Sequence, residues 1–270
     1  MPPRLLRPLR ANLLCLAHRP VAAHASVPIP ARAPCARHAR TPVAIALFLA
    51  LGTDAGAETL AEVLAAVTAA ARAETPEGAD VTITCDRGCR TSRAILLDRG
   101  DTRYVEVKDG PRALLSPGRL LVAKDGKVSE GPLDARLGDS GVLLCELTIF
   151  RADSLALPQI SDDGPAGLVV TAAPARPSPY VLLVLTIDRG RHAIAKTQYY
   201  RGSIGHLARL RRDAGWVELR GRWRPREVTF EDLDEKATTR LSLSWRAAPE
   251  APAVLFEPAG LERSSALTWP

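Results

Sequence analysis

The chain has 270 residues, with 36 basic and 30 acidic side chains and a net charge of +6. The first 57 residues contain seven of the arginines and one of the acids, so residues 58–270 carry 29 side chains of each sign. The positive charge therefore belongs to the first segment. Residues 58–270 are near neutral, so the net charge of the whole chain is no evidence that the protein binds nucleic acid.

Residues 1–57 have the pattern of a secretory leader. A basic stretch precedes the apolar run VAIALFLALG, and the small residues Ala55-Gly56-Ala57 follow. A basic region, a short apolar core and a small-residue site make up a signal peptide. The apolar core is shorter than the ~20 residues of a membrane-spanning helix. We expect cleavage near Ala57 and Glu58, which leaves residues 58–270 as a single periplasmic domain.

The stretch ETLAEVLAAVTAAARAE, residues 58–74, predicts one amphipathic helix. Its larger apolar side chains recur at helical spacing, and the other positions are mostly alanine or charged. These apolar residues are Leu60, Val63, Leu64 and Val67.

A hairpin is predicted next, from VTIT and SRAILL on either side of a CDRGC turn. In an oxidising periplasm Cys85 and Cys89 could form a disulfide across this turn. We expect no metal site, because His192 and His206 lie far along the chain without clustered partners. Cys145 is expected to be a buried apolar side chain.

Short runs rich in β-formers continue to the end of the chain and predict an antiparallel sheet, open or partly closed. TRYVEV, GRLLVAKDGKV and AGLVVTA are separated by turn residues, and two strands meet at DRGRH. TTRLSLSWR alternates, with Leu241, Leu243 and Trp245 on one face. EDLDE is expected at a solvated hairpin tip.

The strand YVLLVLTI, residues 180–187, breaks this alternation because it is apolar on both faces. Both faces are therefore expected to be covered, as in a strand that lines a cavity or in an ordinary sandwich core. Alternation gives one all-aliphatic face, which we expect to line a cavity. Its residues are Val181, Leu183, Leu185 and Ile187.

The sequence LGDSGV contains the Gly-Asp-Ser-Gly core of trypsin-like serine proteases around Ser140. A trypsin-like triad needs a histidine earlier in the chain. Every histidine before Ser140 lies in the predicted leader. We interpret the stretch as a turn between strands. No other set of side chains has the mutual support that catalysis requires, so we expect neither an enzyme nor a cofactor.

The last third carries a recognisable order of short motifs. A strand ends at Asp188 before a hairpin, GRWRP follows at 221–225, and LFEPAGLER closes the chain from residue 255. This layout resembles the outer-membrane lipoprotein-sorting (LolA-like) family over roughly residues 100–263. The resemblance places LGDSGVLLCEL in a loop beside a cavity mouth. We expect Trp223, Pro225 and Phe256 to be structural, with Trp223 anchoring its hairpin to the core.

The resemblance implies a curved, unclosed antiparallel sheet whose concave apolar face is covered by the N-terminal helix. It implies a periplasmic carrier of acylated lipoproteins or lipids, acting as a monomer between an inner-membrane exporter and an outer-membrane acceptor. A lipid sensor or envelope-stress regulator on the same fold is the alternative. If the protein is a carrier, the acyl site is lined by the apolar residues of the 58–74 helix and by the all-aliphatic face of strand 180–187.

Overall fold

The computed structural model describes residues 58–124 and 126–262. The leader and cleavage site predicted around residues 1–57 lie outside these ranges. No helix within the described ranges is both long and apolar enough to cross a membrane.

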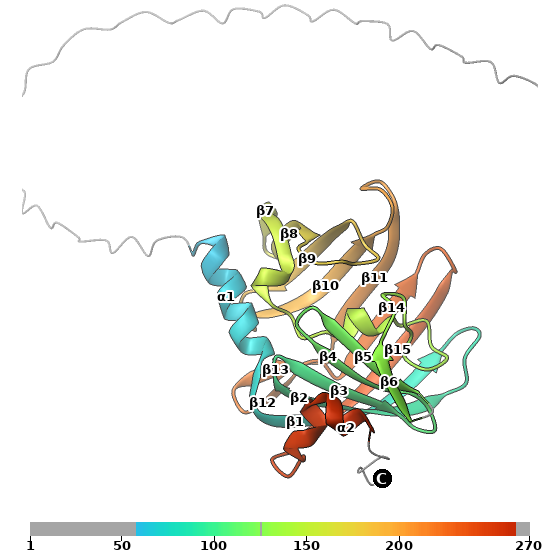
Figure 1. The fold of residues 1–270 in the computed structure, drawn as a ribbon. Coiled ribbons are helices and arrows are strands. Elements are labelled where there is room, and N and C mark those ends of the chain that lie inside the picture. Colours follow the sequence, from blue (N-terminus) through green and yellow to red (C-terminus); the bar gives the residue numbers. More distant parts are fainter. Residues whose placement is uncertain (1–57, 125, 263–270) are drawn as a thin grey trace, which may run out of the picture. The chain divides into compact units, whose positions relative to one another are not determined.

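One antiparallel sheet of thirteen strands dominates the fold, in the order β6-β5-β4-β3-β2-β1-β15-β14-β11-β10-β9-β8-β7 (Figure 1). Strands β6 and β7 stand at opposite ends of this order, so the sheet is unclosed, as the family resemblance implies. The sheet strands are β1 (Ala73–Cys85), β2 (Ser92–Gly100), β3 (Thr102–Val107), β4 (Arg112–Ser116), β5 (Arg119–Lys124), β6 (Lys127–Glu130), β7 (Leu155–Gly164), β8 (Gly167–Pro174), β9 (Leu182–Asp188), β10 (Ala193–Tyr200), β11 (Leu207–Ala214), β14 (Glu227–Asp232) and β15 (Ala237–Ala247).

A few shorter elements complete the described chain, beginning with a separate two-stranded hairpin next to the main sheet. They are β12 (Val217–Leu219), β13 (Arg222–Arg224), the helices α1 (Leu60–Ala71) and α2 (Pro258–Glu262), and the 3-10 turns η1 (Leu144–Leu147), η2 (Ala152–Ser154) and η3 (Ala253–Phe256).

Helix α1 begins with a capping box. The Thr59 hydroxyl accepts from the Glu62 N–H at 3.3 Å, and the Glu62 carboxylate accepts from the Thr59 N–H at 2.8 Å. The helix ends at Ala71, earlier than predicted from the alanine-rich sequence up to residue 74. Ala73 already pairs with Gly100 of β2 and is fully buried. Sheet pairing here overrides local helix propensity.

The predicted hairpins and alternation are confirmed. β1 and β2 pair on either side of the cysteine turn, and β9 and β10 flank the DRGRH turn. On β15, Leu241 and Leu243 are buried while Arg240 and Ser242 are exposed. Alternation with a period of two is therefore sufficient to orient this strand.

Both faces are buried on β2 and on its neighbours β3 and β4, whereas the expectation that strand 180–187 is covered on both faces is wrong. Residues Ala94–Asp98 of β2 are all buried. On β9, Leu182, Val184 and Thr186 remain half-exposed. β2 is covered outside because the C-terminal elements pack there, and no such layer lies over the outer face of β9 in the described chain.

The two faces of the sheet carry different layers. Loop residues Leu137–Leu147 pack on the inner face against Leu96 and Val105. On the outer face η3 and α2 cover Tyr104 and its neighbours through Leu255 and Leu261. Phe256 packs at the edge of this outer layer, with the Arg99 guanidinium carbon 5.9 Å from its ring centre.

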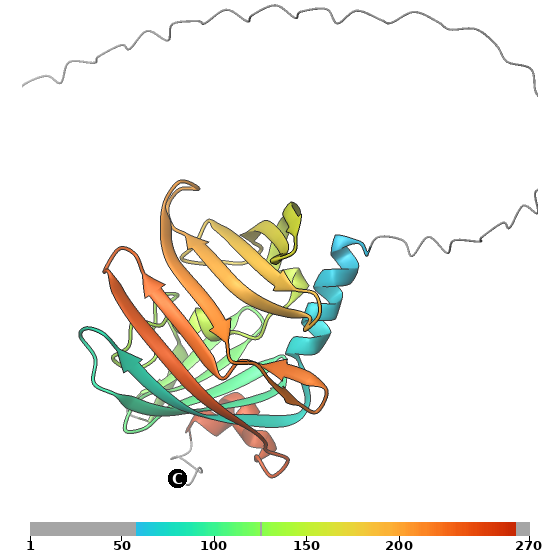
Figure 2. The ribbon, with the colours of Figure 1, turned by 180° about the vertical axis from the view of Figure 1, so that it is seen from behind.

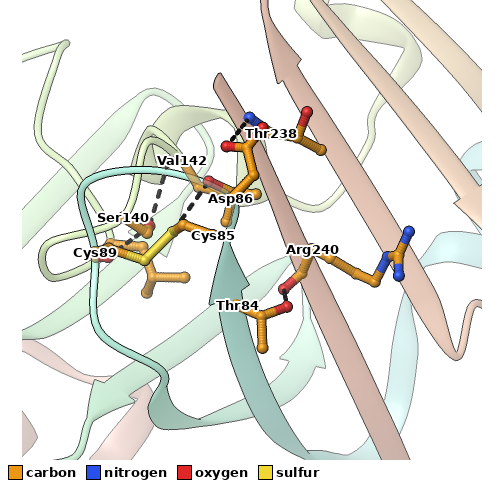
Figure 3. The surroundings of a disulfide bond; sticks show 10 residues. Thr84, Cys85, Asp86, Cys89, Ser140, Val142, Thr238 and Arg240 are labelled. Carbon is orange, nitrogen blue, oxygen red and sulfur yellow. Dashed lines mark hydrogen bonds between the residues drawn. A yellow bond between two sulfur atoms is a disulfide. The ribbon is translucent and has the colours of Figure 1, made fainter. Parts of the chain in front are cut away.

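A disulfide joins Cys85 and Cys89 at the tip between β1 and β2 (Figure 3). The tip is tied to the start of β15. The Asp86 N–H donates to the Thr238 carbonyl at 3.0 Å, and the Asp86 carboxylate accepts from the Thr238 N–H at 2.8 Å. The disulfide therefore closes a turn that is already held by the neighbouring strand.

Replacing Gly167 with alanine is expected to lower the free energy of unfolding by about 2–3 kcal/mol. Gly167 has a φ of +120°, and an added β-carbon would lie 2.5 Å from the backbone oxygen of Ile187. The matched control is Gly202→Ala. Its φ is +70° but no atom lies within 4 Å of the added carbon. This change should lower the free energy of unfolding by only about 1 kcal/mol.

Urea denaturation compares the two variants. Coinciding midpoints would contradict the prediction.

Candidate functional site

A cavity of about 390 Å³ lies on the inner side of the sheet, between its two ends. One wall comes from the turn between β4 and β5, at residues 115–120. The opposite wall comes from β9–β11 and from residues 174–180, which connect β8 to β9. Residues from the segment 145–155 complete the lining. Curvature of the unclosed sheet thus brings strands from both halves of the chain around one space.

The structure brings most of the predicted lining residues together. Leu183 and Leu185 of β9 line the cavity. Ile187, on the same face of β9, packs with both Leu185 and the buried face of α1. α1 lies beside β10 and β13, as both views show (Figures 1 and 2). The helix residues in this cluster are Val63, Leu64 and Val67, with Leu60 at its edge.

The other predicted lining residues do not line this cavity: Ile187 and the four helix residues belong to the apolar cluster, and Val181 belongs to neither. The side chain of Val181 is 42% exposed, whereas the neighbouring Tyr180 is buried and lines the cavity. Regular strand geometry begins only at Leu182. The Tyr180 N–H bonds to the Ser178 hydroxyl at 3.1 Å, in a turn. Alternation cannot be extended back through a turn, so Tyr180 points inward and Val181 does not.

A second cavity, of about 140 Å³, lies beneath the C-terminal end of α1. Val67 borders it from the helix. Trp223 and Pro225 also line it, and the Pro225 carbonyl accepts a hydrogen bond from Trp245 Nε1 at 2.7 Å. Trp223 is half-buried, with the Arg191 guanidinium carbon 5.3 Å from its ring centre. Its anchoring role stays a prediction.

A buried polar cluster stands beside the larger cavity. The Glu146 carboxylate accepts from the Leu143 N–H at 2.8 Å and from the Tyr180 hydroxyl, and Arg209 Nε lies 3.1 Å away. Burial raises the pKa of Glu146, and the charge of Arg209 opposes that shift. Arg211 forms a two-point pair with Asp213 at 2.7 Å. Glu146 and Arg211 on this wall are therefore paired with other charged side chains.

The LGDSGV stretch is a turn, as interpreted from the sequence. The Ser140 hydroxyl donates to the Leu137 carbonyl at 2.7 Å and accepts from the Val142 N–H at 3.3 Å. Ser140 is buried at 2% exposure. The Ser140 hydroxyl therefore stabilises the turn through both hydrogen bonds (Figure 3). The chain continues from this turn into η1 and the cavity wall.

Cys145 is only partly buried and lines the larger cavity, whereas the sequence predicts a buried apolar side chain. Burial, followed by the charge of Glu146, raises the pKa of the Cys145 thiol to about 12. A raised pKa keeps the thiol neutral at physiological pH, and the neutral thiol is a poor nucleophile.

Alkylation of Cys145 by iodoacetamide at mildly alkaline pH is therefore expected to be on the order of 100-fold slower in the folded protein than in urea. Peptide mass spectrometry would follow Cys145 separately from the other cysteines. Equal rates in the folded and unfolded protein would show that the thiol is neither desolvated nor shielded.

Comparison with known proteins identifies the fold. No family model and no curated protein sequence matches the chain. Among solved structures, an outer membrane lipoprotein-sorting protein domain from Vibrio parahaemolyticus superposes with a TM-score of 0.62 at 15% identity, covering 75% of this chain and 97% of that one. A LolA superfamily protein from Nitrosomonas europaea gives 0.55 at 17% identity, covering 71% and 94%. The chain has the LolA-like fold.

The LolA-like fold is shared with a further solved structure. A DUF1329 family protein from Desulfovibrio piger superposes with a TM-score of 0.63 at 13% identity, covering 76% of this chain and all of the other. At such identities the likeness concerns the fold. The resemblance read from the order of motifs in the last third is confirmed at that level.

Sequence reasoning missed the polar part of the cavity wall in this LolA-like fold. Glu146, Tyr180 and Arg211 line the larger cavity together with the aliphatic residues. They come from η1, the β8–β9 connection and β11, and no local pattern links these segments. The nearest sequence signal is the stretch LGDSGVLLCEL, which contains Glu146 and which the resemblance placed in a loop beside a cavity mouth.

Proposed function

We propose that the protein is a periplasmic carrier that binds acyl chains of lipoproteins or lipids and transfers them towards the outer membrane. It performs no chemistry on its cargo. One observation carries the proposal: a LolA-like sheet encloses a cavity lined by Leu183 and Leu185, next to an apolar helix. A volume of about 390 Å³ is within the usual range of small-molecule sites.

The physical chemistry of the lining supports this function. Contact with apolar side chains strengthens the binding of an acyl chain. Contact with unpaired polar groups weakens it, because those groups lose their hydration without gaining a hydrogen bond. Glu146 and Arg211 form ion pairs within the protein. An acyl chain that enters the cavity therefore does not have to desolvate either of these groups as an unpaired charge.

The position of α1 favours a releasable cargo. Val63 and Leu64 pack against β8 and β9 in this structure. Binding exchanges these contacts for contacts with the acyl chain, so net affinity is the difference between the two. A carrier that must give up its cargo benefits from such a balance.

The test uses the full chain, purified after export and freed of lipid. Titration with a fluorescent fatty acid should show saturable binding, and loaded protein should release the probe to acceptor vesicles. Saturable binding without release would favour the sensor function. Absence of binding by any acyl probe would contradict both functions.

A further inference from the structure

The two cavities share one continuous floor. Ile194 and Thr197 of β10 and Arg211 of β11 line both the larger and the smaller cavity. The remaining residues common to both are the consecutive Thr148, Ile149 and Phe150. The span 148–150 therefore crosses above a floor that runs uninterrupted from one cavity to the other.

The span is fixed firmly at its first end. Arg103 Nη1 donates to the Leu147 carbonyl at 2.6 Å, and Arg211 Nη1 donates to the Glu146 carbonyl at 2.8 Å. Arg103 is itself held by Asp98 at 2.7 Å. These are charge-assisted bonds from largely buried side chains, so η1 is a rigid support.

The second end is fixed as well. Arg151 pairs with Asp153 at 2.6 Å and also with Asp101. The Ala152 N–H donates to the Thr68 hydroxyl of α1 at 2.9 Å. Between these supports, the backbone of residues 148–150 makes no hydrogen bond to other groups of the described chain. The span can move without breaking backbone pairing.

Phe150 is the largest side chain of the span. It is half-buried and packs at the edge of the cluster formed by α1, β8 and β9. Its ring is held there by apolar contact, which an incoming apolar chain can replace. Phe150 borders both cavities, so a change in the position of its ring changes the space between them.

We infer that the two cavities are compartments of one acyl tunnel and that Phe150 is the partition that sets how long a chain the tunnel accepts. The inference rests on the proposed function and names its ligand class as single saturated chains. Shorter chains fill the larger compartment, and longer ones must displace Phe150 to continue beneath α1.

The experiment measures the dissociation constants of saturated fatty acids of increasing length, in two-carbon steps, by displacement of a fluorescent fatty acid from the full chain. Each methylene that becomes buried should raise affinity about fourfold, and a methylene that stays outside should add little. For the wild type we expect a rise in affinity that levels off once the larger compartment is filled.

Phe150→Ala should move this plateau to chains at least two carbons longer, and Phe150→Trp should move it to shorter ones. The matched control is Phe256→Ala. Phe256 is also half-buried, but it lies on the outer face and lines neither cavity. The control should lose stability without moving the plateau.

The outcomes separate the two proposals. Binding with the same plateau in wild type, Phe150→Ala and Phe150→Trp overturns the partition and leaves the carrier function standing. If the plateau moves equally in Phe256→Ala, the partition is also overturned, because a general loss of stability would then explain the change in chain-length preference. Absence of any fatty-acid binding in the wild type overturns the carrier function and the partition together.

Discussion

Replacing Glu77 with alanine is expected to lower the free energy of unfolding by about 3–5 kcal/mol, the cost of breaking a buried ion pair by removing one partner. Glu77 is fully buried on β1. Its carboxylate pairs with Arg222 and, at 3.0 Å, with Arg224 Nε, both from β13. Alanine would leave two largely buried guanidinium groups facing each other without an anion.

The effect should reach helix α1 because Arg224 also holds its C-terminal end. Arg224 Nη1 donates to the Ala70 carbonyl at 3.0 Å, and Nη2 donates to the Ala71 carbonyl at 3.3 Å. Glu77 thus orients a cation that caps the helix. We expect amide hydrogen exchange in the last turn of α1 to accelerate in Glu77→Ala.

Glu227→Ala is the matched control for this prediction. Glu227 on β14 pairs with Arg240 at 3.0 Å, but both side chains are about half-exposed. A surface pair of this kind is worth about 0–1 kcal/mol. Urea denaturation compares the two variants. If Glu77→Ala costs no more than Glu227→Ala, the buried pair does not hold the β12–β13 hairpin and the helix in place.

Leu183→Asp is expected to weaken fatty-acid binding by about 100-fold or more. Leu183 lines the larger cavity and packs against Tyr180 and Tyr199. An aspartate there places a carboxylate where the acyl chain would lie. Either the carboxylate is desolvated on binding or water is retained in the cavity, and both reduce affinity.

Thr186→Asp adds the same charge to the same strand and is the control. Thr186 lies on the opposite face of β9, half-exposed and paired in register with Lys196 of β10. Its binding should stay within a few-fold of the wild type. Circular dichroism would establish that both variants fold. Loss of binding in Thr186→Asp alone would mean that the outer face of β9 is the binding face.

Local sequence patterns were sufficient wherever one segment and its nearest neighbour decide the structure. The alternation of β15 oriented Leu241 and Leu243 inward, and apolar spacing identified the buried face of α1. Turn residues placed the hairpins because a short turn forces the two flanking strands together. The order of motifs in the last third also indicated the fold that the solved structures share.

Patterns were insufficient where a residue's surroundings come from distant parts of the chain. The pattern of strand 180–187 predicts cover on both faces, yet the outer cover, formed by η3 and α2, lies over β2 to β5. Alternation predicts that Val181 points inward and Tyr180 outward. In the structure Tyr180 is buried and Val181 is exposed, because regular strand geometry begins only at Leu182.

By itself, then, the sequence determined a mainly β, antiparallel fold with one amphipathic helix, since those features follow from residue periodicity and turn chemistry. That the sheet is unclosed was implied only by the resemblance of the last third to the LolA-like family. Only the tertiary structure decided the composition of the cavity wall. Glu146 meets Arg209 and Tyr180 because sheet curvature brings η1, β11 and the β8–β9 connection to one place. Periodicity records which side a residue faces, whereas the identity of its partner depends on how distant strands curve around a common interior.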